Sequence, residues 1–186
     1  MKSGYALKLS IMGLLIAVGI LIPMVSPLKI VLEPASFTLA SHVAIFIAMF
    51  ISLDVAVAVT IGTTIGFFLG GFPLVIVARA ASHLMFATVG ALYLNLRHTY
   101  NIRQNPVQLR LFSLVIAIIH ATFEVLAVTV FFFTGAMGTA YYQKGFLSSV
   151  LLLVGLGTVI HSLVDFEIAN VVILALRRHP KLKSVV

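Results

Sequence analysis

Six ionisable side chains interrupt the apolar segments of this sequence, and they fall into three pairs. Each pair has a spacing of four residues: Arg79 with His83, His120 with Glu124, and His161 with Asp165. On an α-helix, residues four apart lie on one face, with their Cβ atoms about 6 Å apart. Ionisable groups within such apolar segments are costly, and they mark sites for substrates or ions. The three polar faces therefore predict one shared pocket among three helices.

Arg79 decides which chemistry this pocket is expected to perform. A guanidinium held away from water needs an anionic partner, and the sequence offers two kinds. Glu124 on a neighbouring helix is one, and the pair would then only order the helices. The carboxylate of a bound molecule is the other, and Arg79 would then bind the substrate. Both alternatives stay open on the sequence alone.

Histidines at the centres of three segments also suggest a metal site, because imidazole binds divalent transition metals. Metal ligands must converge within about 2.1 Å of the ion, and spacing on separate helices does not establish this. The sequence has no H-x-x-x-H or H-E-x-x-H motif and no cysteine. We therefore expect hydrogen bonds to an organic ligand and no metal. His42 is a further candidate for ligand contact, with a helix–helix hydrogen bond as the alternative.

The composition indicates which elements position these groups. Of the 186 residues, 61% are hydrophobic and 9% are charged, whereas soluble domains are about 45–50% apolar and about 25% charged. A water-soluble globule is excluded, because too few polar side chains remain to cover its surface. We expect one all-α integral membrane domain over residues 1–186, since a spanning segment must satisfy its own backbone hydrogen bonds. Proline, glycine and polar breaks predict six transmembrane helices, at approximately 5–25, 36–52, 54–70, 73–96, 108–134 and 146–177.

Positive charges are distributed unevenly between the ends of these helices. Nine of the 12 Lys and Arg residues fall on the side of both termini: Lys2, Lys8, Arg97, Arg103, Arg110, Arg177, Arg178, Lys181 and Lys183. The opposite loops hold only Lys29 and Lys144. Because an excess of Lys and Arg marks the cytoplasmic side, we expect both termini in the cytoplasm. The net charge of +7 is therefore assigned to topology, and no nucleic-acid binding is expected.

Small residues provide a second signal on the first helix. Gly13 and Ala17 have the small-xxx-small spacing that lets another helix approach closely. The partner helix belongs either to this bundle or to another protein, and the sequence leaves both open. Glycines 62, 66, 70 and 71 repeat the spacing near the third segment, where we expect them to serve packing inside the fold.

The chain resembles the substrate-binding S components of energy-coupling factor (ECF) vitamin transporters, on residues 33–52 and 62–94 and on the expected six-helix architecture. The similarity covers essentially the whole chain. It implies a protein of the bacterial plasma membrane that binds a vitamin from outside, with a transmembrane coupling protein and two cytosolic ATPases as partners. ATP would be used by those partners, so this chain is expected to be no enzyme and to bind no cofactor. Gly13 and Ala17 match the family position that contacts the coupling protein.

A fixed arginine favours a vitamin that carries a carboxylate. The chain has no tryptophan, and a flat ring would usually want stacking partners, so pantothenate is the first choice and niacin the alternative. Two further hypotheses come from other classes. One is a stand-alone transporter that uses Glu124 or Asp165 as a proton carrier. The other is an intramembrane enzyme with His–carboxylate pairs for acid–base catalysis.

Overall fold

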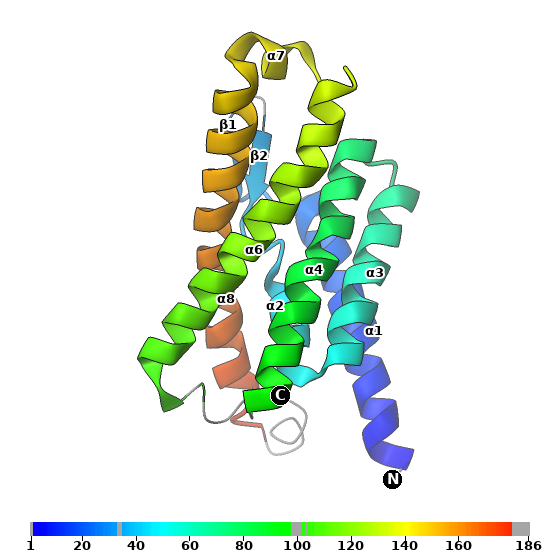
Figure 1. Cartoon of the computed structure of the whole chain (residues 1–186). Helices are drawn as coiled ribbons and strands as arrows, with labels where there is room; N and C mark the ends of the chain where they lie inside the picture. The colour runs from blue at the N-terminus through cyan, green and yellow to red at the C-terminus, as the bar shows by residue number, and fades with distance from the viewer. Residues whose placement is uncertain (1, 33–34, 98–101, 103, 180–186) are drawn as a thin grey trace.

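Long helices form a bundle in the computed structural model, which describes residues 2–32, 35–97, 102 and 104–179 (Figure 1). The long helices are α1 (Lys2–Val25), α3 (Leu53–Leu69), α4 (Leu74–Arg97), α6 (Pro106–Phe133) and α8 (Gly157–Leu176). The shorter ones are α2 (Val43–Ile51), α7 (Thr139–Phe146) and the π-helix η1 (Leu147–Leu156). Strands β1 (Lys29–Leu32) and β2 (Ala35–Thr38) pair antiparallel. The helical class is confirmed, and the hairpin is an addition that the sequence did not predict.

The number of complete spans differs from the expected six. Four segments are long and apolar enough to cross a membrane: Tyr5–Val25, Leu74–Leu96, Pro106–Phe133 and Thr139–Leu176. Helix α3 is apolar but has only 17 residues. The expected span at 36–52 is wrong, because its first residues form β2 and the nine residues of α2 reach only about 13 Å at 1.5 Å per residue. The hydrocarbon core of a bilayer is about 30 Å thick.

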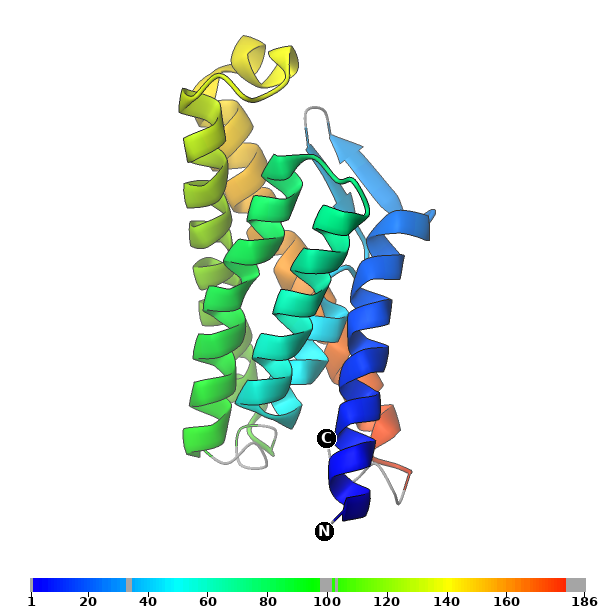
Figure 2. The same cartoon turned by 90° about the vertical axis from the view of Figure 1, so that its right-hand side faces the viewer.

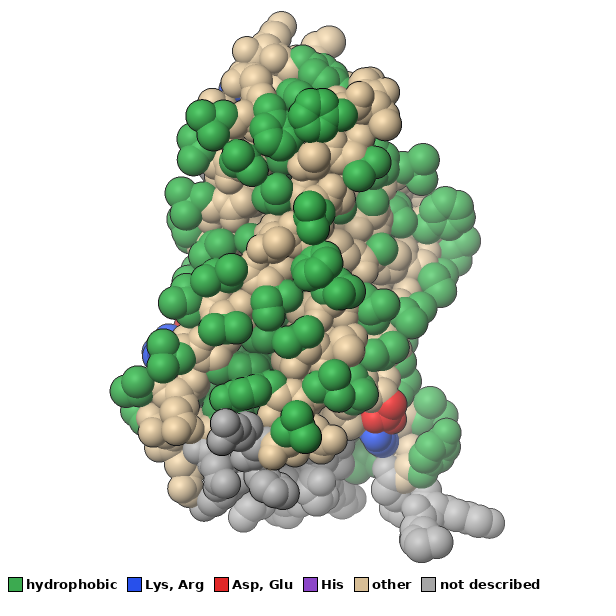
Figure 3. Space-filling view, viewed as in Figure 1, with side chains coloured by type: hydrophobic (Ala, Val, Ile, Leu, Met, Phe, Trp, Pro, Cys, Tyr) green, Lys and Arg blue, Asp and Glu red, His purple; other side chains and the backbone are tan. Residues whose placement is uncertain are grey.

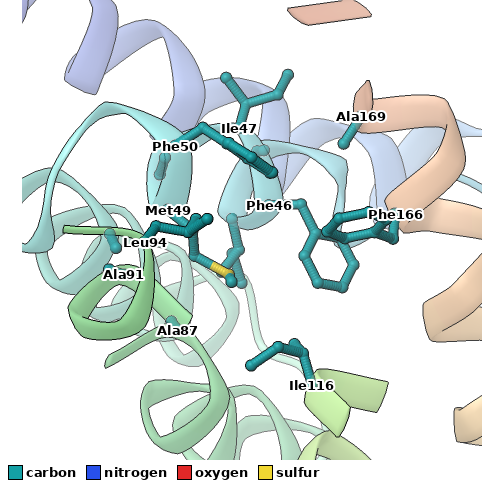
Figure 4. Packing of buried hydrophobic residues seen from close by; sticks show 14 of the residues in the cluster. Phe46, Ile47, Met49, Phe50, Ala87, Ala91, Leu94, Ile116, Phe166 and Ala169 are labelled. Carbon is teal, nitrogen blue, oxygen red and sulfur yellow. The ribbon is translucent and has the colours of Figure 1, made fainter. Parts of the chain in front are cut away.

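Helix α2 is short and lies inside the protein. Every residue from Val43 to Phe50 is buried. The centroid of the Phe46 ring is 5.4 Å from those of Phe86 on α4 and Phe166 on α8, and Figure 4 shows the Phe46 and Phe166 side chains next to each other. Gly90 of α4 has no side chain where Met49 of α2 approaches it. An apolar run of this length can form a buried core helix as well as a transmembrane span, and in this structure it forms a core helix.

The described ends of the chain lie at one end of the bundle. Figure 2 shows the start of α1 and the end of α8 close to one level, with the hairpin and α7 at the opposite end. This agrees with the expected placement of both termini on one side of the membrane, and the cytoplasmic assignment of that side stays a prediction. Hydrophobic side chains cover the face seen in Figure 3, with few charged ones between them, as lipid contact requires.

Helices α1 and α3 pack through glycine. A Cβ atom on Gly62 would meet Ile16 at 2.7 Å, and one on Gly66 would meet Ile20. This confirms the packing role expected for these two glycines. Gly71 instead has φ of +74° in the turn before α4, a conformation that L-residues rarely adopt. A Cβ atom on Gly13 would meet nothing within 4 Å among the described residues, so no other helix of the described bundle packs closely against this position.

We predict that Gly66→Val destabilises the protein while Gly13→Val does not. Added bulk at Gly66 forces α1 away from α3, and overpacking of this kind costs about 1–3 kcal/mol in the free energy of unfolding. Thermal unfolding in detergent measures the difference. Both variants place a β-branched residue within a helix, so the intrinsic helix propensity is matched. Equal melting temperatures for the two variants would contradict the close packing of α1 on α3.

Candidate functional site

The structure brings all seven predicted ligand-binding residues together in one cluster of contacting side chains. Helix α4 supplies Arg79 and His83, α6 supplies His120 and Glu124, α8 supplies His161 and Asp165, and His42 immediately precedes α2. The spacing of four residues places each pair on an inward-facing surface, as expected. The prediction that these groups share one region is therefore confirmed, and their role in binding substrate stays a prediction.

Glu124 joins three helices through its two oxygens. Oε2 accepts hydrogen bonds from Nη2 of Arg79 at 2.9 Å and from Oγ1 of Thr158 at 2.6 Å. Oε1 lies 3.0 Å from Nε2 of His83. The residue is 1% exposed, so these partners replace water around the carboxylate. Arg79 and Glu124 thus form an ion pair, which was one of the two alternatives left open by the sequence.

Asp165 holds the chain where it enters α2. Its Oδ1 accepts the backbone N–H of Ala40 at 2.8 Å, and its Oδ2 accepts the backbone N–H of His42 at 2.9 Å. Nδ1 of His42 lies 3.0 Å from the same Oδ2. Ala40 has φ of +67°, so this turn is strained for a residue with a side chain. A buried carboxylate stabilises the strained turn, because it pairs backbone donors that no helix or strand satisfies.

Four imidazole rings lie against one another between these two carboxylates. The His42 ring is 4.6 to 5.0 Å, centroid to centroid, from those of His83, His120 and His161. The His83 and His120 rings are 4.7 Å apart. Nδ1 of His120 lies 3.2 Å from Oγ of Ser162, and its Nε2 is buried without a hydrogen-bond partner. His42 is therefore the central member of the cluster, and it comes from the segment that the sequence misassigned.

A pocket of about 110 Å³ opens beside this cluster, toward the hairpin end of the molecule. Five of the seven predicted residues line it: His42, Arg79, His83, Glu124 and His161. His120 and Asp165 do not line the pocket and lie behind its wall. Nε of Arg79 is buried and has no hydrogen-bond partner, although the side chain lines the pocket. Among the described residues, the guanidinium thus has one buried N–H without an acceptor, while the Arg79 side chain lines the pocket.

Aromatic side chains that the sequence did not single out form part of the pocket wall. Phe37 comes from β2, while Phe67 and Phe72 flank the turn between α3 and α4. The Phe67 and Phe72 rings are stacked, with centroids 4.6 Å apart and planes 20° apart. Phenylalanine is common throughout the chain, so only the fold distinguishes these three. Their presence removes the reason for which the sequence favoured an aliphatic ligand over a flat ring.

Polar neighbours of the carboxylates were also missed. Thr158, Ser162 and Asp165 lie on one face of α8, since they are spaced by four and then three residues. The same helical spacing that places Asp165 on the inward face would also have placed Thr158 and Ser162 there. Ser and Thr in apolar helices also bond their own backbone, as Thr60 and Thr63 do here, so their presence alone does not indicate a site.

Comparison with known proteins gives one informative match. A protein of Lactococcus lactis subsp. cremoris (strain MG1363), described as the niacin transporter NiaX, is 39% identical over 168 residues. The alignment covers 90% of this chain and 73% of that protein. The chain belongs to the NiaX family. No family model and no solved structure matches the chain.

Membership of the NiaX family confirms the expected class of membrane transporter. It gives no support to the pantothenate preference, which rested on a supposed lack of stacking partners, and it agrees with the niacin alternative.

We predict that Asp165→Ala loosens the entry to α2. The backbone N–H groups of Ala40 and His42 would lose their buried acceptor, at about 1–3 kcal/mol for each group left unpaired. Hydrogen–deuterium exchange should accelerate in the peptide that covers residues 38–46.

Glu167→Ala is the matched control on the same helix. Glu167 pairs with Arg110, whose side chain is 66% exposed, and such pairs contribute at most about 1 kcal/mol. Unchanged exchange of the 38–46 peptide in Asp165→Ala would show that Asp165 does not hold this turn.

Proposed function

We propose that this chain is the substrate-binding S component of an ECF vitamin importer and that niacin, as its carboxylate anion, is the substrate. The observation that carries the proposal is the 39% identity to the niacin transporter NiaX along 90% of the chain. Niacin replaces the pantothenate that the sequence favoured. The chain would act in the plasma membrane of a bacterium, with the pocket opening outward.

The guanidinium of Arg79, which lines the pocket, supports a carboxylate ligand. Arginine presents five N–H donors in a rigid fork, and the bond from Nη2 to Glu124 leaves Nε without a partner. A carboxylate that enters the pocket can accept a charge-assisted hydrogen bond from the guanidinium of Arg79, whose side chain lines the pocket. In this proposal Arg79 keeps both anionic partners, Glu124 on one side and the ligand on the other.

The rest of the pocket supports a small aromatic acid. Phe37, Phe67 and Phe72 offer ring faces and edges to a pyridine ring. Imidazole groups of His83 and His161 also line the wall and can hydrogen-bond the ring nitrogen. A pocket of about 110 Å³ suits one ring with a carboxylate better than a vitamin with a long chain.

The outer surface of α1 supports the proposed association with a coupling protein. Gly13 and Ala17 are both exposed, and a Cβ atom added to Gly13 would meet no other part of the described chain within 4 Å. Gly19 on the same helix instead packs against Thr63, where an added Cβ would approach Oγ1 to 2.8 Å. The small-residue surface is thus available to a second helix from another protein. In the proposal that protein is the transmembrane coupling subunit, and two cytosolic ATPases bound to it hydrolyse ATP.

We predict that Arg79→Lys weakens niacin binding about 10- to 100-fold while the protein stays folded. Lysine keeps the positive charge beside Glu124 but lacks the guanidinium fork, and a hydrogen bond to a charged group is worth about 1.5–3 kcal/mol. Isothermal titration of the detergent-solubilised chain with niacin measures the change. Nicotinamide, which has no carboxylate, should bind the wild-type protein weakly.

Arg110→Lys is the matched control, because Arg110 also pairs with a carboxylate but lies on the exposed surface of α6. It should bind niacin as the wild type does. Equal binding of niacin and nicotinamide, with no effect of Arg79→Lys, would refute the assignment. Niacin uptake into liposomes by this chain alone, without ATP, would refute the S-component role and favour an ion-coupled transporter.

We predict that Gly13→Leu combined with Ala17→Leu abolishes co-purification with the coupling protein and leaves niacin binding intact. Leucine side chains would hold a partner helix away from α1. Leu14→Phe adds bulk at a neighbouring residue that is 63% exposed, and it serves as the control. A double variant that still co-purifies would place the coupling surface elsewhere.

A further inference from the structure

We infer that the histidine cluster binds one divalent transition-metal ion, with His42, His83, His120 and Glu124 as ligands. One donor atom from each of these residues lies within 4.8 Å of those from the others, and all four residues are buried. Three imidazoles and a carboxylate are a donor set suited to Zn²⁺. No metal is expected from the sequence, because spacing alone could not bring together ligands from two helices, α4 and α6, and from the turn before α2.

The distances around Glu124 are already close to those of a tetrahedral site. Ligand distances of about 2.0–2.1 Å place tetrahedral donor atoms about 3.4 Å apart. Oε1 of Glu124 lies 3.0 Å from Nε2 of His83 and 3.5 Å from Nε2 of His120. Since all four donor atoms lie within 4.8 Å of one another, any pair would have to close by at most about 1.4 Å to reach this geometry.

Outer partners hold the ligands as they do in metal sites. A ligating histidine typically gives its other ring N–H to a carboxylate or another acceptor. Nδ1 of His42 lies 3.0 Å from Asp165, so its Nε2 keeps a lone pair for the ion. Nδ1 of His120 lies 3.2 Å from Ser162, and its Nε2 is buried without a hydrogen-bond partner. Arg79 and Thr158 hold the other oxygen of Glu124.

The net charge of the buried polar cluster is negative, which favours the binding of a cation. Glu124 and Asp165 contribute −2 and Arg79 contributes +1, so the described buried groups sum to −1 with neutral histidines. Lys29 lines the pocket mouth but is exposed to solvent. An anionic ligand would change the net charge of these groups from −1 to −2, which is costly in a region of low dielectric. A divalent ion brings the sum to +1, and the anion then brings it to zero.

A second set of candidate ligands, His42, His161 and Asp165, shares one histidine with the first. Asp165 already accepts two backbone N–H groups at the entry to α2, and His161 is only partly buried. We therefore assign the ion to the first set. The ion also supplies positive charge to the vitamin carboxylate beside Arg79, and this last step rests on the proposed function.

The metal is tested first, without any vitamin. Chelator-treated protein is titrated with Zn²⁺ and, separately, with Co²⁺. We expect one ion per chain, a rise in melting temperature with Zn²⁺, and visible absorption bands of tetrahedral Co²⁺. His120→Ala should weaken binding at least 10-fold, and Ser162→Ala, which removes only an outer partner, about 10-fold. His179→Ala, at an exposed position beyond α8, should bind as the wild type does.

The coupling to the vitamin is tested second, by titrating niacin into chelated and Zn²⁺-loaded protein. We expect at least 10-fold tighter binding to the loaded form. No stoichiometric Zn²⁺ or Co²⁺ binding by wild-type protein, or binding unchanged in both His120→Ala and Ser162→Ala, would overturn the metal site. Equal niacin affinity with and without metal would overturn the coupling alone. Metal binding with no niacin binding would refute the proposed function and leave the metal site standing.

Discussion

Glu124 and Asp165 lie fully inside a protein that faces hydrocarbon, and a carboxylate in that position persists only if its oxygens are paired. The rest of the interior is arranged around this requirement. Glu124 takes its partners from α4 and α8, and Asp165 takes its partners from the turn before α2. Because each carboxylate binds groups on other elements, the two together fix the positions of four helices.

The irregular backbone between the hairpin and α2 follows from the same constraint. Backbone outside helices and closed sheets is tolerated at membrane depth only where it is buried in protein and satisfied there. Asp165 provides that satisfaction for Ala40 and His42, so α2 can begin in the interior instead of at the membrane surface. A full span over 36–52 would have carried His42 into the first turns of a long helix. The shorter helix leaves its imidazole at the centre of the cluster, in contact with the three other rings.

Local sequence signals predicted the parts of the site that depend on helical periodicity. The pairs on α4, α6 and α8 were found because a spacing of four residues has a fixed geometric meaning on a helix. The hairpin and the buried position of α2 could not be found in this way. An apolar run such as Val43–Ile51 has the same composition whether its neighbours are lipid or protein. The aromatic wall was missed for a related reason, since Phe37, Phe67 and Phe72 come from separate elements and meet only in the folded chain.

The hairpin can reach the pocket because α8 has a glycine, Gly157, where Phe37 of the hairpin approaches it. A Cβ atom on Gly157 would lie 2.6 Å from Cζ of Phe37, so any larger residue there would displace the Phe37 ring. In its observed place the ring also lies 5.6 Å from the His161 ring, between the hairpin and the polar cluster. Gly157 follows directly on the π-helix η1, whose wider turns alter the rotation of the chain before α8 begins. One segment thus sets two features together: the direction in which Thr158, His161 and Asp165 point, and the depth to which the hairpin closes over them.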